Sequence, residues 1–221
     1  MSRGAAAPAG AGGPLKIGSG GNRPVGGLPA PHRLVETPFN LRSGEGRVLV
    51  FDVETCRSAE DVGGWDHIRD MGLALAVVYD VGRNEASTYF EEDVERLVLD
   101  LVMADCVIGY NSERFDLEVL AGYGSWDLTR IRSLDMLKYI KDRIGFRLKL
   151  GDLAEVNLNA GKSADGLQSL QWYKEGRLDL IEEYCRRDVE VTARLFFLGR
   201  EGGYLLFRGR DGVNLRMPID W

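Results

Sequence analysis

Histidine and cysteine are scarce in this chain. Only His32 and His67 occur among its 221 residues, which excludes a three-histidine metal site and leaves almost no place for histidine-based catalysis. The cysteines, Cys56, Cys106 and Cys185, are far apart and form no CxxC pair. This argues against a disulfide scaffold or a zinc module and predicts a reduced protein in the cytoplasm.

Long hydrophobic runs are also missing. The longest, residues 71–79, is far shorter than the roughly 20 residues that a membrane span needs, so we expect no membrane partner. Glycine and proline interrupt the start of the chain, and no secretory signal is visible. The hydrophobic content of 44% and the charged content of 28% fit a packed globular core.

Proline is rare except at the N-terminus. Residues 1–31 contain nine Gly, six Ala and five of the seven Pro, a composition that cannot bury enough apolar surface to offset its ordering entropy. We therefore interpret 1–46 as a disordered tail and lead-in. The folded domain is expected over 47–200, and a C-terminal extension over 201–221.

From residue 47 onward, strand patterns alternate with helix patterns. Three leading strands precede a helix–strand–helix–strand order and a helical end, which predicts an α/β fold with a mixed β-sheet flanked by helices. Two short apolar runs around Arg-Gly-Arg-Asp-Gly predict a C-terminal β-hairpin. Strands are expected at 48–53, 71–81, 86–90, 106–110 and 131–134, helices at 93–104, 115–123, 135–144, 150–157, 166–174 and 178–198, and the hairpin at 204–207 and 213–217.

Two carboxylates end the first strand. Alternation along a strand places Asp52 and Glu54 on the same face, roughly 6–7 Å apart, after an apolar run that reads as buried. Buried carboxylates are costly unless they are paired or bind a metal. The alternative is that the strand stops at Asp52 and that both acids are solvated.

A third carboxylate, Asp188, lies on the apolar face of the long C-terminal helix. Tyr184 is one turn before it, and apolar residues continue the stripe at spacings of three and four. An acid in a stripe that faces the core needs a partner, either a metal or a basic residue across the core. Asp116 is less informative alone, because an acid in the first turn of a helix complements the helix dipole, and Asn111 is suited to capping that helix.

Together these acids can converge at one edge of the sheet. Hard divalent cations prefer such oxygen ligands, and Mg²⁺ sites combine a few carboxylates with substrate phosphates. Two ions about 4 Å apart stabilise the attacking and leaving oxygens of a phosphoryl displacement.

Three motifs in these segments resemble those of a known superfamily. Asp52-Val53-Glu54, Asn111-x3-Phe115-Asp116 and Tyr184-x3-Asp188 look like the motifs of the DEDD 3′–5′ exonucleases, which have a ribonuclease H-like fold. The tyrosine is similar to that of the DEDDy branch, since the DEDDh branch has a histidine near this position. The resemblance extends to YprB-type predicted exonucleases and to the proofreading domains of family B polymerases, and it spans about 48–198.

The resemblance implies a metal-dependent 3′–5′ exonuclease. Asp52, Glu54, Asp116 and Asp188 would hold two Mg²⁺ or Mn²⁺ ions, and Tyr184 would orient the attacking water. The expected partner is the 3′ end of single-stranded nucleic acid, with DNA favoured over RNA and 5′-mononucleotides released. A helicase or polymerase partner is not identifiable from this chain. The alternatives are a structure-specific nuclease on the same fold and a catalytically silent module that binds nucleic acid or protein.

Substrate contacts are expected from side chains near the motifs and from one basic segment. Residues 129–150 carry seven Lys or Arg against two Asp, which suits a phosphate backbone and suits an exposed helix face equally well. Aromatic side chains near the motifs could stack on bases, although core packing is their usual role. The candidate substrate-binding residues are Thr55, Asn111, Phe115, Trp65 and Lys162.

Overall fold

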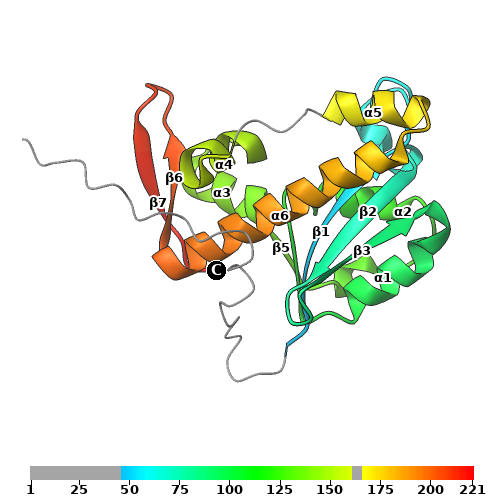
Figure 1. Cartoon of the computed structure of the whole chain (residues 1–221), viewed down its shortest axis with the longest axis horizontal. Coiled ribbons are helices and arrows are strands. Elements are labelled where there is room, and N and C mark those ends of the chain that lie inside the picture. The colour runs from blue at the N-terminus through cyan, green and yellow to red at the C-terminus, as the bar shows by residue number, and fades with distance from the viewer. Residues whose placement is uncertain (1–45, 161–165) are drawn as a thin grey trace, which may run out of the picture.

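The computed structural model describes residues 46–160 and 166–221. The main sheet has five strands in the order β3-β2-β1-β4-β5. A separate two-stranded sheet of β6 and β7 lies at the end of the molecule away from the main sheet (Figure 1). The strands are β1 (Val48–Thr55), β2 (Leu73–Asp80), β3 (Glu85–Phe90), β4 (Cys106–Gly109), β5 (Ser133–Asp135), β6 (Tyr204–Arg208) and β7 (Asn214–Pro218). The α-helices are α1 (Val94–Val102), α2 (Asp116–Ala121), α3 (Met136–Ile144), α4 (Leu150–Leu158), α5 (Gly166–Lys174) and α6 (Leu178–Gly202), and short 3₁₀ turns lie at Trp65–Asp70, Glu91–Asp93 and Leu128–Arg130.

The sheet is mixed. β1, β2 and β3 form an antiparallel meander, whereas β4 pairs parallel with β1, and β5 pairs parallel with β4. The predicted α/β fold class, with helices around a mixed sheet and a C-terminal hairpin, is therefore confirmed. The architecture is compatible with the ribonuclease H-like fold expected from the sequence.

Strand β1 buries both of its faces, as its alternating pattern predicts. Leu49, Phe51 and Val53 belong to the core on one side of the sheet, and Val48 and Val50 belong to the core on the other. Helix α6 crosses the second face and contacts β1 and β2, whereas α1 and α2 lie against the opposite face (Figure 1). The central strand is thus enclosed, and its two acids lie near its C-terminal end.

Helix α6 carries the longest buried stripe of the domain. Ile181, Cys185 and Thr192 are buried along it, while Asp188 is only half-buried at the edge of the stripe. The sequence pattern predicted that Asp188 lies in the middle of the core-facing stripe of α6. In the structure, Cys185 lies in the middle of that stripe. The helix ends at Gly202 and is capped by Gly203, whose φ of 69° is the left-handed conformation that glycine adopts readily. No helix in the described ranges is both long and apolar enough to span a bilayer.

The C-terminal hairpin is fixed to the domain by packing and by hydrogen bonds. Leu205, Phe207 and Met217 are buried in the α6 side of the core. At the outer edge of β6, the Leu206 N–H donates to Asn157 Oδ1 (2.8 Å), and Asn157 Nδ2 donates to the Leu206 carbonyl (2.7 Å). The Asn157 side chain on α4 thereby replaces a neighbouring strand, so the hairpin closes the structure rather than extending the main sheet.

Candidate active site

The parallel strands β1, β4 and β5 bring their C-terminal ends to one edge of the sheet, where α/β proteins commonly bind ligands. Asp52 and Glu54 lie at this end of β1. Asp116 begins α2, and its Oδ1 accepts a hydrogen bond from the Val53 N–H at 3.0 Å. This bond holds Asp116 beside the β1 acids, 63 residues away in sequence.

A cleft of about 630 Å³ opens at this edge. Helix α5 contributes Gly166, Leu167 and Leu170 to its wall, and Tyr110 contributes from the end of β4. Eight of the ten candidate site residues line this one cleft: Asp52, Glu54, Thr55, Trp65, Phe115, Asp116, Tyr184 and Asp188.

The cleft is strongly acidic at its base. Burial, followed by repulsion from Asp116, Glu54 and Asp188, raises the pKa of Asp52 well above its ordinary value. Burial is also the main cause that raises the pKa of Glu54 to about 8 and the pKa of Asp116 to about 7. Arg57 is the only Lys or Arg among the described residues that line the cleft, so carboxylates outnumber basic side chains in that lining.

Cys185 of α6 contacts the first acid. Its Sγ lies 3.4 Å from the Asp52 carbonyl oxygen and 3.6 Å from Asp52 Oδ2. One ligand atom each from Asp52, Glu54 and Cys185 lie within 4.8 Å of one another. Burial and the neighbouring carboxylates raise the pKa of the Cys185 thiol, so it is a protonated donor to Asp52 rather than a thiolate.

Tyr184 and Asp188 complete the α6 side of the site. Burial, followed by the charge of the nearby Asp188, raises the pKa of the Tyr184 phenol. The Tyr184 ring packs edge-on against Trp172 of α5, with 6.2 Å between ring centroids. The phenol is therefore neutral, and its ring is packed against Trp172 at the cleft wall.

The loop that leads into α2 is organised by Asp135, a residue that sequence reasoning missed. Asp135 accepts hydrogen bonds from the backbone N–H groups of Asn111 (2.9 Å), Glu113 (3.1 Å) and Lys138 (3.1 Å). The bond from Lys138 N caps α3. An Asp directly before a helical pattern is a recognised capping signal and could have identified it.

Asn111 does not cap α2, contrary to the expectation from sequence. It lies five residues before the helix with φ of 71°, and its side-chain oxygen accepts a hydrogen bond from Arg147 Nη2 at 2.6 Å. Asn tolerates this left-handed backbone better than most residues. Asn111 is outside the set that lines the cleft, although its neighbour Tyr110 belongs to it.

Ser169 of α5 was also missed, because a single serine in a helical pattern carries no signal. It is 1% exposed, and its hydroxyl lowers the pKa of the nearby Glu54. Its Oγ meets no acceptor or donor at full hydrogen-bond geometry among the described residues, so it lies near Glu54 without a well-aligned bond to it.

The remaining candidate substrate residues differ in their availability. Trp65 is 62% exposed, and its ring centroid lies 6.4 Å from that of Phe115, so two aromatic rings flank the cleft. The Thr55 hydroxyl is already used, because it donates to the Arg57 carbonyl at 3.0 Å. Lys162 lies outside the described residues.

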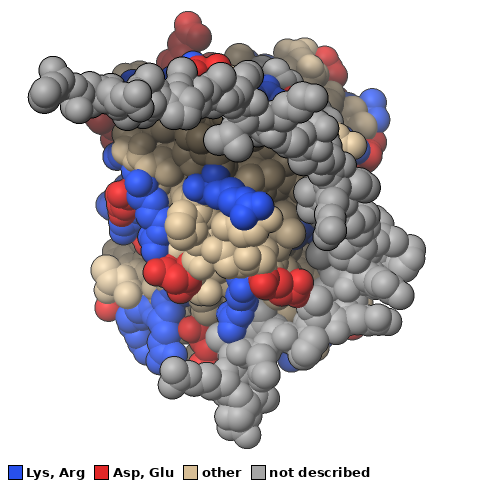
Figure 2. All heavy atoms as spheres, turned by 90° about the vertical axis from the view of Figure 1, so that its left-hand side faces the viewer, with Lys and Arg blue, Asp and Glu red and all other residues tan. Residues whose placement is uncertain are grey.

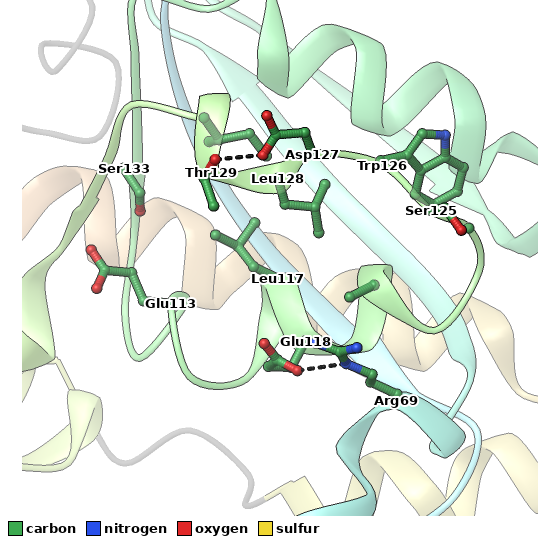
Figure 3. Close-up of a pocket in the computed structure, with 13 residues that line it drawn as sticks. Arg69, Glu113, Leu117, Glu118, Ser125, Trp126, Asp127, Leu128, Thr129 and Ser133 are labelled. Carbon is green, nitrogen blue, oxygen red and sulfur yellow. Dashed lines mark hydrogen bonds and ion pairs between the residues drawn. The ribbon is translucent and has the colours of Figure 1, made fainter.

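A second hollow of about 690 Å³ lies on the other side of α2 (Figure 3). Its charged side chains are mostly paired within the protein: Arg69 bonds Glu118 at 2.8 Å, Glu113 bonds Lys138, and Asp127 accepts a bond from Thr129. None of the candidate catalytic residues lines it. The cleft at the end of β1 is therefore the better candidate for an active site.

Comparisons with known proteins do not assign this chain to a family: no protein-family model matches it, and no curated protein is similar to it.

Proposed function

We propose that the chain is a metal-dependent 3′–5′ exonuclease that hydrolyses phosphodiester bonds at the 3′ end of single-stranded nucleic acid, with DNA favoured. The observation that carries this proposal is the convergence of Asp52, Glu54, Asp116 and Asp188 with Tyr184 on one cleft, from three segments far apart in sequence. The motif resemblance predicted this set, and the fold brings all five side chains together.

The donor chemistry of the cleft fits hard divalent cations. Its acids are carboxylates that lie close together, and burial with repulsion from neighbouring carboxylates raises the pKa values of Asp52 and Glu54. Carboxylate oxygens are hard ligands, so a cleft whose candidate ligands are four carboxylates favours Mg²⁺ or Mn²⁺ over zinc. Asp52, Glu54, Asp116 and Asp188 would hold two such ions. When bound, these ions would supply an activated water and charge stabilisation at the phosphate oxygens.

The protein's own groups would position the reactants. Tyr184 lines the cleft near Asp188, and its neutral hydroxyl would orient the attacking water there. The Val53–Asp116 hydrogen bond fixes Asp116 against β1. The exposed ring of Trp65 and the neighbouring Phe115 offer apolar faces on which the terminal base would stack.

The decisive experiment uses 5′-labelled single-stranded DNA and RNA of one sequence. Each strand is incubated with the purified protein and Mg²⁺ or Mn²⁺, beside EDTA and Asp188→Ala controls. We expect a ladder that shortens from the 3′ end and is absent from both controls, with faster cleavage of DNA. Absence of cleavage with either strand and either metal would refute the proposal.

A further inference from the structure

The loop 145–149 lies between the candidate active site and the C-terminal hairpin. On the cleft side, Tyr110 donates its hydroxyl to the Leu148 carbonyl (3.0 Å), and Arg147 donates to Asn111 (2.6 Å). These bonds place Arg147 at the rim of the cleft, because Tyr110 lines it.

The same loop contacts the hairpin on its other side. Phe146 packs edge-on against Phe207 of β6 with 6.1 Å between ring centroids, and the Arg210 guanidinium lies 5.5 Å from the centre of the Phe146 ring. Asn157 holds β6 against α4, so the Phe146–Phe207 contact joins the loop to a hairpin that is itself fixed to the domain. A continuous surface thus leads from the cleft rim across the loop to the hairpin tip.

This surface is rich in available positive charge. Lys141, Arg147, Lys149 and Arg210 are exposed. The side chains of Lys141 and Lys149 have no hydrogen bond or ion pair to any described residue, and the Arg210 guanidinium has only its contact with the Phe146 ring. Figure 2 looks onto the hairpin end of the molecule and shows blue Lys and Arg side chains around an uncharged surface, with red side chains between some of them.

Some of the acids near this surface already form ion pairs or hydrogen bonds within the protein. Glu155 pairs with Arg208 at 3.4 Å, and Asp220 pairs with Arg143. Asp211, next to Arg210, accepts the Val213 N–H at 3.1 Å within the hairpin turn. Asp142 and Asp152 are exposed, so the surface is mixed in charge but has an excess of cations over 138–149, where five Lys or Arg accompany one Asp.

We propose that this surface, defined by Arg147, Lys149 and Arg210 with the Phe146 ring, binds the nucleotides upstream of the 3′ end that enters the cleft. The partner is the single strand itself, bound through its phosphates and through stacking on an aromatic ring. The inference rests on the proposed exonuclease function. It adds a second binding region that short substrates do not reach.

The test compares the binding of 5′-fluorescein-labelled oligothymidylates of 3 and 12 nucleotides, in Ca²⁺ to suppress cleavage. The variant is Lys149→Glu with Arg210→Glu. The matched control is Arg83→Glu with Arg96→Glu, which makes the same charge change away from this surface, in the β2–β3 turn and on α1, where both side chains are exposed. Fluorescence anisotropy over a range of salt concentrations gives the affinities.

We expect the wild type and the control to bind the 12-mer at least tenfold more tightly than the 3-mer. The variant should bind the 12-mer no more tightly than the 3-mer. The slope of its log affinity against log salt concentration should be smaller in magnitude by about 1.4, for two lost phosphate contacts. If the wild type cleaves DNA but the variant binds the 12-mer as the control does, this inference is wrong and the exonuclease proposal stands. If the wild type neither binds nor cleaves either strand, the exonuclease proposal fails and the inference fails with it.

Discussion

The backbone N–H of Val53 donates a hydrogen bond to Asp116 Oδ1 at 3.0 Å, and this bond joins the first and second acidic motifs. Val53 lies between Asp52 and Glu54 on β1, and its own side chain is buried on the opposite face of the sheet. The bond therefore uses the main chain of the acidic strand itself to hold the third carboxylate beside the other two. Predictions about this cluster follow from its burial and its unbalanced charge.

Replacement of Asp188 by alanine should abolish cleavage and spare the fold. Asp188 is half-buried at the edge of the α6 stripe, and its removal relieves repulsion on Asp52 and Glu54. We expect a loss in kcat on the order of 10²–10³-fold or more, the scale for one lost electrostatic contact in an active site. The melting temperature without metal should stay the same or rise, and the increase caused by Mg²⁺ or Mn²⁺ should shrink. Wild-type cleavage by this variant would show that the site is assigned wrongly.

Tyr184→Phe separates the hydroxyl from the ring. The Phe ring keeps the packing against Trp172, whereas the hydroxyl beside Asp188 is lost. We expect kcat to fall by about 10–100-fold, within the range typical of proton-handling groups, while the melting-temperature increase with Mg²⁺ persists. Single-turnover kinetics at saturating substrate measure this effect. An unchanged rate would remove the tyrosine from the mechanism.

The stability of the metal-free protein should depend on pH in a direction set by the raised carboxylate pKa values. Folded Asp116 and Glu54 titrate near 7 and 8, whereas in the unfolded chain such groups titrate near 4. The folded state holds protons that the unfolded state has lost, so this contribution is complete below about pH 4 and is lost as pH rises through 7 and 8.

In EDTA, the melting temperature should therefore fall by several degrees from pH 6 to pH 9, since 1 kcal/mol corresponds to roughly 2–4 °C in a domain of this size. Metal binding requires the deprotonated acids, so the affinity for Mn²⁺ should rise with pH over the same window, with release of protons. Calorimetry in buffers of different ionisation enthalpy measures that release. The double variant Glu54→Gln with Asp116→Asn is the control and should show a flatter pH profile. A wild-type melting temperature that rises over this range would contradict the prediction.

The parts of the site that sequence could predict are those encoded by local patterns. Alternation in β1 predicts the shared face of Asp52 and Glu54, and the 3.6-residue repeat of α6 places Tyr184 and Asp188 on one side. Asn111 was misread as a helix cap because its backbone has φ of 71°, a conformation that its neighbours in sequence do not reveal. Cys185 and Ser169 reach the acids only through the packing of α6 and α5 on the sheet. Such contacts between distant segments leave no periodic signal in a single sequence.

The last prediction concerns Asp135, which supports the site without lining the cleft. Its carboxylate accepts backbone N–H groups from Asn111 and Glu113 and caps α3 through Lys138 N. Asp135→Ala leaves these donors without an acceptor, at a cost of about 2–4 kcal/mol. It also loosens the loop that positions Asp116.

We expect a clear drop in the urea midpoint, faster hydrogen exchange at the amides of residues 111 and 113, and a lower kcat with little change in KM, because a small displacement of a catalytic group slows the chemical step. Asp135→Asn should show an intermediate loss, since its amide keeps one oxygen acceptor and turns a donor toward another N–H. Asp142→Ala, which removes an exposed acid from α3, the helix that Asp135 caps, is the matched control. If Asp135→Ala lost activity while the amides of residues 111 and 113 exchanged hydrogen at the wild-type rate, Asp135 would act on the reaction by a route other than the loop.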